Sequence, residues 1–150
     1  MSKKPLIVFE GIEGSGKTLH SNNLAKFLRK KRIPFIKFRE PGSTQNSEKI
    51  RKLILNKKNK FNKNTDLLLY LASRSENYHK ILKKNLGKRI FLIDRFIDST
   101  VAYQHYGMGI NLKIIKFINN FVIGNIKADM TFLHIVKLSK MKKRIIKRRN

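Results

Sequence analysis

A glycine-rich loop between an apolar strand and a helix constrains this chain more than any other feature. Residues 11–18 read G-I-E-G-S-G-K-T, which fits G-x-x-x-x-G-K-[ST] without a mismatch, and the apolar run at 6–9 precedes them with Glu10 between. The glycines let the backbone curl so that its N–H groups point inward, and the following helix adds its positive N-terminal end. The pattern predicts a phosphate-binding loop, and therefore a nucleoside triphosphate site.

The side chains of this loop have separate predicted tasks. Lys17 would reach the β- and γ-phosphates, and the Thr18 hydroxyl would complete a magnesium shell. A chance match in a glycine turn is the alternative, but the strand–loop–helix context favours the motif. We therefore expect the whole loop to bind ATP, through Gly11, Ile12, Glu13, Gly14, Ser15, Gly16, Lys17 and Thr18.

Length and composition set the limits for the rest of the chain. A sequence of 150 residues suits one domain, 1–150, that is able to bury a single core. No apolar run reaches the roughly 18 residues that span a bilayer, and no cleavable signal peptide is apparent, so we expect neither a membrane partner nor export. Cysteine is absent, which excludes disulfides and is compatible with a cytoplasmic protein.

The net charge is strongly positive. Lys and Arg number 35 against 9 Asp and Glu, which gives a formal charge of +26. Such a balance raises the possibility of nucleic-acid binding, although the lysines are spread over helix faces and loops, as a general compositional bias would produce. Nonspecific adhesion to RNA at low salt would follow whether the positive charge reflects a nucleic-acid partner or only compositional bias.

Hydrophobic periodicity predicts alternating strands and helices. Leu24, Phe27 and Leu28 would share one face of the first helix. The pattern βα, βαα, βαα, βα argues for an α/β fold with one doubly wound parallel sheet. We expect strands at 6–10, 34–39, 89–93 and 131–136, and helices at 18–31, 46–56, 66–86, 98–106, 111–124 and from 139 onward.

Two of these predicted elements place side chains in particular ways. The long helix at 66–86 would turn six apolar residues inward, namely Leu67, Leu68, Leu71, Ile81, Leu82 and Leu86. The third strand ends in Asp94 and Arg95, so that a carboxylate and a guanidinium emerge at its carboxyl end. Ligands of open α/β sheets bind at that edge, which makes this pair a candidate for the site.

Four sequence clusters, in this order and spacing, resemble thymidylate kinases of the bacterial type. They read F-E-G-I-E-G-S-G-K-T at 9–18, F-R-E-P-G-S-T at 38–44, L-Y-L-A-S-R at 69–74 and D-R-F-I-D-S-T-V-A-Y-Q at 94–104. The resemblance implies the P-loop nucleoside monophosphate kinase fold, phosphorylation of dTMP to dTDP with Mg-ATP in dTTP synthesis, and a homodimer.

The resemblance also assigns roles near the transferred phosphate. Glu13 would face the sugar hydroxyl of the acceptor nucleotide, and Asp94 would be the carboxylate associated with Mg²⁺. Arg95 would grip the acceptor phosphate, for which a planar guanidinium fork is well suited. Arg39 and Arg51 fall where guanidinium groups approach the dTMP phosphate. A strand-end ion pair is the structural alternative for Asp94 and Arg95, and solvent exposure is the alternative for Arg51.

A second group of residues would form the thymine pocket by the same resemblance. Tyr70 would stack on the base and Arg74 would read a carbonyl oxygen, while Thr100 and Gln104 would supply further polar groups. Tyr103 would close the sugar side. Tyr70 as a plain core aromatic is the alternative. Lys17, Arg95 and Glu13 are the expected catalytic residues.

The chain is shorter than the family pattern. It reaches Asn150 about where an arginine-bearing lid would begin, so we expect the lid, the fifth strand and the final helix to be lacking and the fourth strand to be an exposed edge. Arg144, Arg148 and Arg149 are the candidates to stand in for the lid arginines. An arginine finger can contribute about 10³ to 10⁵ in rate, so its loss would slow turnover severely.

Three functional interpretations remain open on the sequence alone. The first is a thymidylate kinase with a shortened C-terminus. The second is a catalytically impaired relic that still binds nucleotide, and the third is a P-loop protein associated with nucleic acid through its positive charge. Among enzymes, a kinase of another nucleoside monophosphate or of a deoxynucleoside is the alternative.

Overall fold

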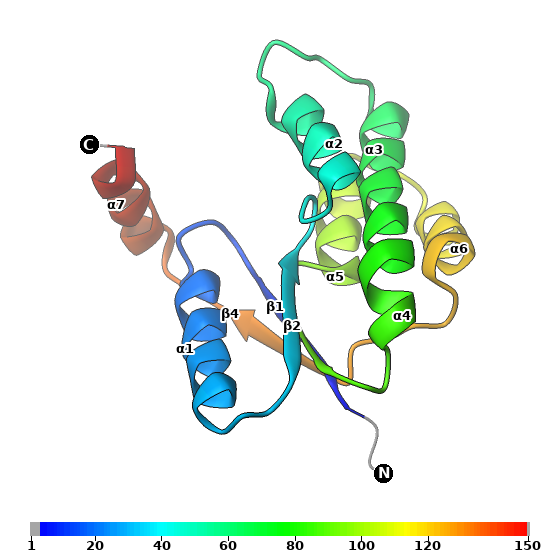
Figure 1. Cartoon of the computed structure of the whole chain (residues 1–150). Helices are drawn as coiled ribbons and strands as arrows, with labels where there is room; N and C mark the ends of the chain where they lie inside the picture. The colour runs from blue at the N-terminus through cyan, green and yellow to red at the C-terminus, as the bar shows by residue number, and fades with distance from the viewer. Residues whose placement is uncertain (1–3, 150) are drawn as a thin grey trace.

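Four parallel strands form the centre of the chain in a computed structural model that describes residues 4–149 (Figure 1). The strand order is β2-β3-β1-β4, with Val8 opposite Ile93 on one side and Thr131 on the other. This is the parallel α/β sheet that the sequence predicts. The strands are β1 Leu6–Gly11, β2 Phe35–Arg39, β3 Ile90–Asp94 and β4 Met130–His134.

Helices cover both faces of the sheet. The helices are α1 Lys17–Lys30, α2 Gln45–Leu55, α3 Lys63–Asn77, α4 Lys83–Asn85, α5 Ile97–Thr100, α6 Leu112–Ile123 and α7 Leu138–Arg149. Helix α1 lies on one face, and α3 to α6 lie on the other (Figure 1). The sheet is therefore doubly wound, as predicted.

Strand β3 shows how the core is divided between these two faces. Phe91 and Ile93 point to one face, where they pack with Leu82 and Ile123, and Leu92 points to the other, where it packs with α1. Successive side chains of a strand alternate between faces, and both faces are covered here. That is why β3 reads as an unbroken apolar run and not as an alternating one.

The helix expected at 66–86 is longer and less regular than predicted. It begins at Lys63, because the Asn62 side chain accepts hydrogen bonds from the backbone N–H groups of Asn64 and Thr65 at 3.0 Å each and so caps the helix. It then widens into a π-helical segment over Tyr78–Leu82 before α4. A second π-helical segment, Val101–Gly107, continues α5.

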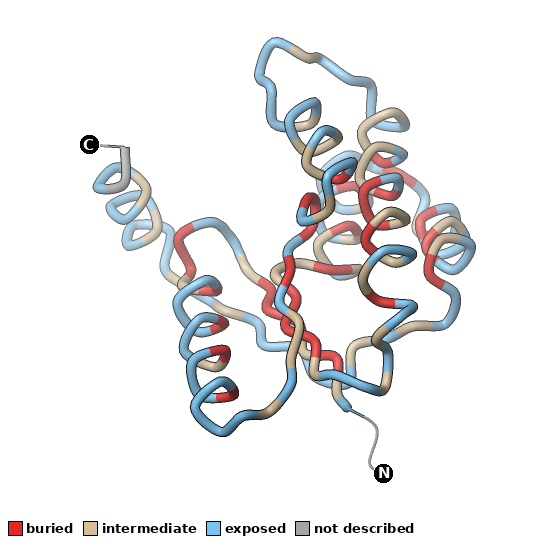
Figure 2. Tube along the Cα trace, in the orientation of Figure 1, coloured by how far each residue is buried: buried red, intermediate tan, exposed pale blue. Residues whose placement is uncertain are grey.

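Two sets of expected core residues need correction. Leu68 and Leu86 do not face inward, and Phe27 does not share the buried face of Leu28; Leu68 and Phe27 are both about half exposed. Each helical residue is turned by about 100° from its neighbour. Once Leu67 and Leu71 face α6, Leu68 must turn away from it. Buried and exposed residues alternate along α1 and α3 (Figure 2).

Strand β4 forms one edge of the sheet and carries apolar side chains into solvent. Within residues 4–149 it pairs with β1 alone. Met130, Phe132 and Leu133 are exposed, as is Ile135 just beyond the strand. The exposed apolar edge expected for the fourth strand is therefore present. Among the described residues, no helix has the length and apolarity to cross a membrane.

Candidate functional site

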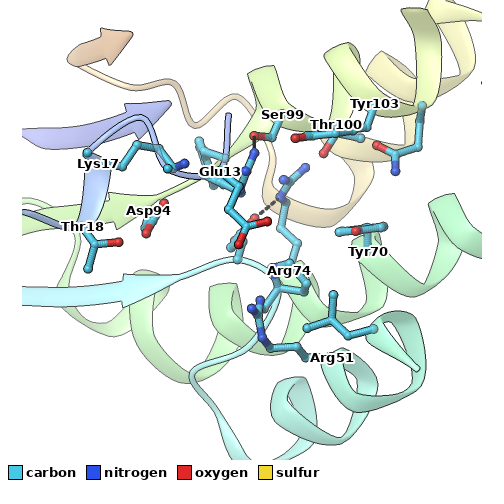
Figure 3. Close-up of a pocket in the computed structure, with 18 of the residues that line it drawn as sticks. Glu13, Lys17, Thr18, Arg51, Tyr70, Arg74, Asp94, Ser99, Thr100 and Tyr103 are labelled. Atoms are coloured by element: carbon cyan, nitrogen blue, oxygen red, sulfur yellow. Dashed lines mark hydrogen bonds and ion pairs between the residues drawn. The ribbon is translucent and has the colours of Figure 1, made fainter. Parts of the chain in front are cut away.

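The carboxyl ends of β1, β2 and β3 open onto one cavity of about 530 Å³. It is lined by Glu13, Gly14, Gly16, Lys17, Thr18, Leu19, Glu40, Pro41, Arg51, Leu55, Tyr70, Arg74, Asp94, Arg95, Phe96, Ser99, Thr100, Tyr103 and Gln104. Lys17, Thr18 and Asp94 lie at one end of the close-up, and Tyr70, Thr100 and Tyr103 lie at the other (Figure 3). The predicted loop and the predicted base pocket therefore share a single cavity.

The glycine loop wraps around the Lys17 side chain. Lys17 is buried, and its Nζ donates hydrogen bonds to the carbonyl oxygens of Gly11 at 2.8 Å and Ile12 at 3.0 Å. A Cβ atom at Gly11 would lie 2.5 Å from the carbonyl oxygen of His134, so only glycine fits at this position. Burial, with the positive charge of Arg95, lowers the pKa of Lys17 below 10.5.

The backbone at Arg95 is held in an unusual conformation by strand β1. Arg95 has φ +69°, in the left-handed region that non-glycine residues rarely adopt. Its N–H donates to the carbonyl oxygen of Phe9 at 3.1 Å, and the next N–H, of Phe96, donates to Glu10 Oε1 at 2.8 Å. The Ser99 hydroxyl donates to Glu10 Oε2 at 2.6 Å. The buried Glu10 carboxylate thus fixes the turn that aims Arg95.

Two contacts, with Ser99 and with Tyr103, hold the Arg95 side chain in place. Its Nη1 donates to the Ser99 hydroxyl oxygen at 3.2 Å, and its guanidinium carbon lies 5.4 Å from the centre of the Tyr103 ring. A guanidinium over an aromatic face is held by a cation–π interaction. Arg95 can therefore meet an anion in the cavity with little reorganisation.

A buried ion pair supports the middle of the cavity. Arg74 Nε donates to Glu40 Oε2 at 2.7 Å, Arg74 Nη1 donates to Asn119 Oδ1 of α6, and the guanidinium lies 5.2 Å from the centre of the Phe96 ring. The side chains of Glu40 and Arg74 are about 95% buried. Burial raises the pKa of Glu40, and the charge of Arg74 opposes that rise. Within residues 4–149, Glu40 Oε1 has no hydrogen-bond partner.

The turn after β2 brings Arg51 into the cavity and leaves Arg39 outside it. Arg51 Nη1 donates to the carbonyl oxygen of Pro41 at 2.8 Å. Burial lowers the pKa of Arg51, and the charge of Arg39 adds to that shift. Arg39 is exposed and binds Glu48 through Nη2 at 2.9 and 3.1 Å. The expectation that Arg39 approaches the acceptor phosphate therefore finds no support in this geometry.

Aromatic and polar groups alternate at the other end of the cavity. Thr100 and Gln104 are buried, and Tyr103 is about half exposed. Burial raises the pKa of Tyr70, and the negative charge of Asp66 adds to that rise. Flat apolar walls with a few convergent polar groups are typical of small-molecule sites, and this end has the chemistry to hold a planar heterocycle.

The structure brings most of the predicted site residues together, but not all of them. Gly11, Ile12, Ser15 and Arg39 do not line the cavity. The carbonyl oxygens of Gly11 and Ile12 accept hydrogen bonds from Lys17, and the Ser15 hydroxyl is buried with no hydrogen-bond partner in the part of the chain that the structure describes. The predicted residues that do line it are Glu13, Gly14, Gly16, Lys17, Thr18, Arg51, Tyr70, Arg74, Asp94, Arg95, Thr100, Tyr103 and Gln104.

Helix α7 touches the phosphate loop from outside the cavity. Arg144 Nη1 donates to the carbonyl oxygen of Gly14 at 2.8 Å, and a Cβ at Gly14 would meet Met141 and Ile145 at 3.6 to 3.7 Å. Arg144 thus lies against the loop, as one candidate to stand in for lid arginines. The side chains of Arg148 and Arg149 lie outside the described part of the structure.

The sequence did not predict the residues that support the side chains of the site. Glu10, Glu40, Asp66 and Asn119 contact functional side chains, or the turns that carry them, yet none was given a role. The chain has only nine acidic residues, and three of them, Glu10, Glu40 and Asp94, stand at the carboxyl ends of strands. An acidic residue at such a place, in so basic a chain, was the signal that could have revealed Glu10 and Glu40.

Comparison with known proteins gives a consistent result. The family model for thymidylate kinase matches residues 9–150. The thymidylate kinase of Sulfurihydrogenibium sp. (strain YO3AOP1) is 43% identical over 129 residues, and that of Thermosipho africanus (strain TCF52B) is 39% identical over 127 residues. These matches cover 85% and 84% of this chain, and in both cases 63% of the relative.

A solved structure shows the same likeness in three dimensions. The crystal structure of thymidylate kinase from Ehrlichia chaffeensis superposes with a TM-score of 0.83 at 39% identity, and the match covers 96% of this chain and 79% of the other. The chain thus spans a little under two thirds of the length of its first curated relatives and about four fifths of this solved chain.

Proposed function

Because this chain belongs to the thymidylate kinase family, we propose that it transfers the γ-phosphoryl group of Mg-ATP to dTMP and forms dTDP, as a step of dTTP synthesis. One observation carries the proposal. The phosphate loop and an end lined by Tyr70 and Tyr103 belong to the same cavity, with Arg95 among the residues that line it. A donor polyphosphate and an acceptor nucleotide would therefore meet there.

The residues of the cavity suit phosphoryl transfer between two anions. Lys17 is turned back onto the loop carbonyls, and burial together with the positive charge of Arg95 lowers its pKa, while the charges of Asp94, Glu10 and Glu13 oppose that shift. Bound phosphates would add negative charge beside the Lys17 ammonium. Arg95, fixed by Glu10, Ser99 and Tyr103, would hold the acceptor phosphate in line with the donor. Catalysis of this kind depends on positioning and on charge neutralisation, and it needs no covalent intermediate.

Two oxygen donors at the phosphate end fit a magnesium ion. Thr18 and Asp94 both line the cavity, and within residues 4–149 no group of three or more His, Cys, Asp or Glu side chains could hold a metal by itself. Mg²⁺ commonly binds through one or two protein oxygens together with substrate phosphates. Mg²⁺ bound there would neutralise phosphate charge, and Thr18 and Asp94 would orient it.

Selection of a deoxynucleotide is proposed for Glu13 and Tyr103. Glu13 lines the cavity from within the phosphate loop, and Tyr103 lines it beside Arg95. A carboxylate next to bound phosphates would be electrostatically unfavourable without a compensating contact. We propose that the compensating contact is a sugar hydroxyl of the acceptor, with Tyr103 closing the other side of the sugar.

We also propose that the chain forms a homodimer through α6. Phe117 and Phe121 are 73% and 84% exposed, and Ile114 on the same stripe is half exposed. Two copies of one apolar stripe can cover each other around a two-fold axis, and α6 carries only two lysines in a chain of charge +26. Replacement of Phe117 and Phe121 by Ser should convert a dimer to a monomer in sedimentation measurements; a wild-type monomer would contradict the proposal.

The direct test is an activity measurement on the 150-residue chain. It would be incubated with Mg-ATP and, separately, dTMP, dUMP, dCMP and AMP, while nucleoside diphosphate formation is followed. We expect dTDP to form fastest, and Lys17→Ala to lower its rate at least about 100-fold. Binding of dTMP without product would indicate the impaired relic, and a faster rate with another acceptor would indicate a different monophosphate kinase. Steep salt-dependent RNA binding with no response to dTMP would favour the nucleic-acid interpretation.

A further inference from the structure

The side-chain amide of Gln104 is held by an acidic residue that has no role so far. Gln104 lines the base end of the cavity and is only 2% exposed. Its Nε2 donates a hydrogen bond to Asp66 Oδ2 at 3.0 Å. Asp66 belongs to the first turn of α3, and Gln104 belongs to the π-helical segment after α5. The bond therefore joins two elements that form opposite sides of the base end.

This bond fixes which atom of the Gln104 amide faces the cavity. An ionised carboxylate only accepts hydrogen bonds, so the amide nitrogen, and not the amide oxygen, must face Asp66. Gln104 Oε1 receives no hydrogen bond from the described residues. It is also not one of the buried polar atoms that lack both a partner and exposed surface. Gln104 Oε1 therefore remains as a hydrogen-bond acceptor that a ligand can reach.

Arg74 presents the opposite polarity in the same cavity. Its Nε is bound to Glu40 and its Nη1 to Asn119, which leaves Nη2 as a donor. A guanidinium has no acceptor atom. The cavity therefore offers one fixed donor, from Arg74, and one fixed acceptor, from Gln104. The Gln104 amide cannot turn over while Asp66 stays in place.

A pyrimidine base offers one of two complementary edges to such a pair. Thymine and uracil present a carbonyl oxygen that accepts and a ring N3–H that donates. Cytosine presents an amino group that donates and a ring nitrogen that accepts. The Arg74 donor and the Gln104 acceptor match the first edge at both positions. They oppose the second edge at both positions, and a buried mismatched pair is costly.

Resting on the proposed function, we infer that Asp66 is a positioning residue that sets base selectivity: it keeps Gln104 Oε1 turned toward the bound base, so that the cavity selects an imide pyrimidine over an aminopyrimidine. Asp66 does not line the cavity itself. It acts through Gln104, whose amide would otherwise be free to turn and to present its N–H₂ group.

The test measures binding, so that it does not depend on turnover. The dissociation constants of dTMP and dCMP would be determined by calorimetry for wild type, Asp66→Asn and Asp98→Asn. The amide of an Asn at position 66 can donate to Gln104, which lets the Gln104 amide turn over. We expect Asp66→Asn to lower the preference for dTMP over dCMP at least about 10-fold. Asp98→Asn is the matched control, because Asp98 is exposed and does not line the cavity.

The outcomes separate the inference from the proposed function. If wild type prefers dTMP and Asp66→Asn keeps that preference while binding both nucleotides more weakly, Asp66 is only structural; the inference fails and the proposed function stands. A wild type that binds neither nucleotide overturns both. If Asp66→Asn does not fold by circular dichroism, Asp66→Ala decides: it frees the amide without adding a donor, so the preference should fall about 3-fold, and an unchanged preference overturns the inference.

Discussion

Two glutamates, at the ends of the two strands that flank β3, have nearly the same burial and opposite environments. Glu10 near the end of β1 is 4% exposed, and Glu40 just after β2 is 6% exposed. Both Glu10 oxygens accept hydrogen bonds from groups of the segment 96–99. Glu40 instead forms an ion pair with the Arg74 side chain through Oε2, and its Oε1 has no hydrogen-bond partner among the described residues.

The difference shows how one residue type performs two tasks in one site. Glu10 binds backbone N–H groups and a hydroxyl, so it fixes the course of the chain and thereby the position of Arg95. Glu40 binds a cation that lines the cavity, so it fixes the direction of a side chain. The backbone N–H partners of Glu10 cannot be removed by substitution, so no second mutation can compensate for the loss of its carboxylate. The ion pair of Glu40 and Arg74 consists of two side chains, and both can be replaced together.

The largest effect should come from breaking the ion pair on one side only. Glu40→Ala leaves Arg74 as an uncompensated buried charge, and we expect it to lower the free energy of unfolding by about 3 to 5 kcal/mol. Adding Arg74→Met should restore most of that loss, because the double variant buries no unpaired charge. Urea unfolding of the single and double variants would measure both effects.

The control for this prediction is an ion pair on the surface. Glu48 binds Arg39, but their side chains are 38% and 50% exposed. Arg39→Ala, which removes this ion pair and keeps the hydrogen bond from Ser43 N–H to Glu48, should therefore cost no more than about 1 kcal/mol. If the double variant at Glu40 and Arg74 is as unstable as Glu40→Ala alone, the two side chains do not act as a unit.

A smaller loss, without rescue, is expected at Glu10. Glu10→Ala leaves the buried N–H of Phe96 without an acceptor and removes two bonds from Ser99, so it should cost about 3 kcal/mol. A further Ser99→Ala should not restore stability, since the Phe96 N–H still lacks a partner. Glu13→Ala, at an exposed position of the nearby loop, should change stability by less than about 0.5 kcal/mol. Full recovery in the double variant would place the main interaction of Glu10 at Ser99 and not at the backbone.

Ser99 alone should have a modest effect with a distinctive pattern. Its hydroxyl donates to Glu10 and accepts from Arg95. Ser99→Ala should therefore cost about 1 kcal/mol of stability and should weaken dTMP binding more than ATP binding, because Arg95 is proposed to hold the acceptor phosphate. Calorimetry with each nucleotide would show the difference; equal weakening of both would argue against that role.

The smallest effect is a pH dependence carried by Glu40. Burial raises its pKa above the ordinary 4.5, so between that value and the raised pKa the folded state binds more protons than the unfolded chain. Stability conferred by protonated Glu40 is present below 4.5 and is lost as pH rises through the folded pKa. The stability of wild type relative to Glu40→Gln should therefore fall as pH rises through this window in thermal unfolding. A relative stability that increases with pH would show that the attraction of Arg74 outweighs burial.

The fold was predictable because its signals are local. Composition and spacing identify the strand at Leu6, the loop to Thr18 and the apolar run from Ile90. The order of these segments predicts a parallel α/β sheet. The errors were also local. Leu68 and Phe27 were placed inside because apolar periodicity tolerates several faces of a helix, and only the neighbours that each helix meets decide which face is buried.

In the candidate site, too, the features carried by local sequence were predictable and the long-range contacts were not. The phosphate loop with Lys17, the strand-end pair Asp94 and Arg95, and the family could be predicted from the sequence, because each depends on residues close together in the chain. Other pairings emerge only from the folded chain: Arg39 binds Glu48, Glu40 and Asn119 hold Arg74, and Asp66 fixes Gln104. Those pairings join residues from 9 to 45 positions apart. Such contacts depend on how the helices pack over the sheet, and no spacing along the chain encodes that packing.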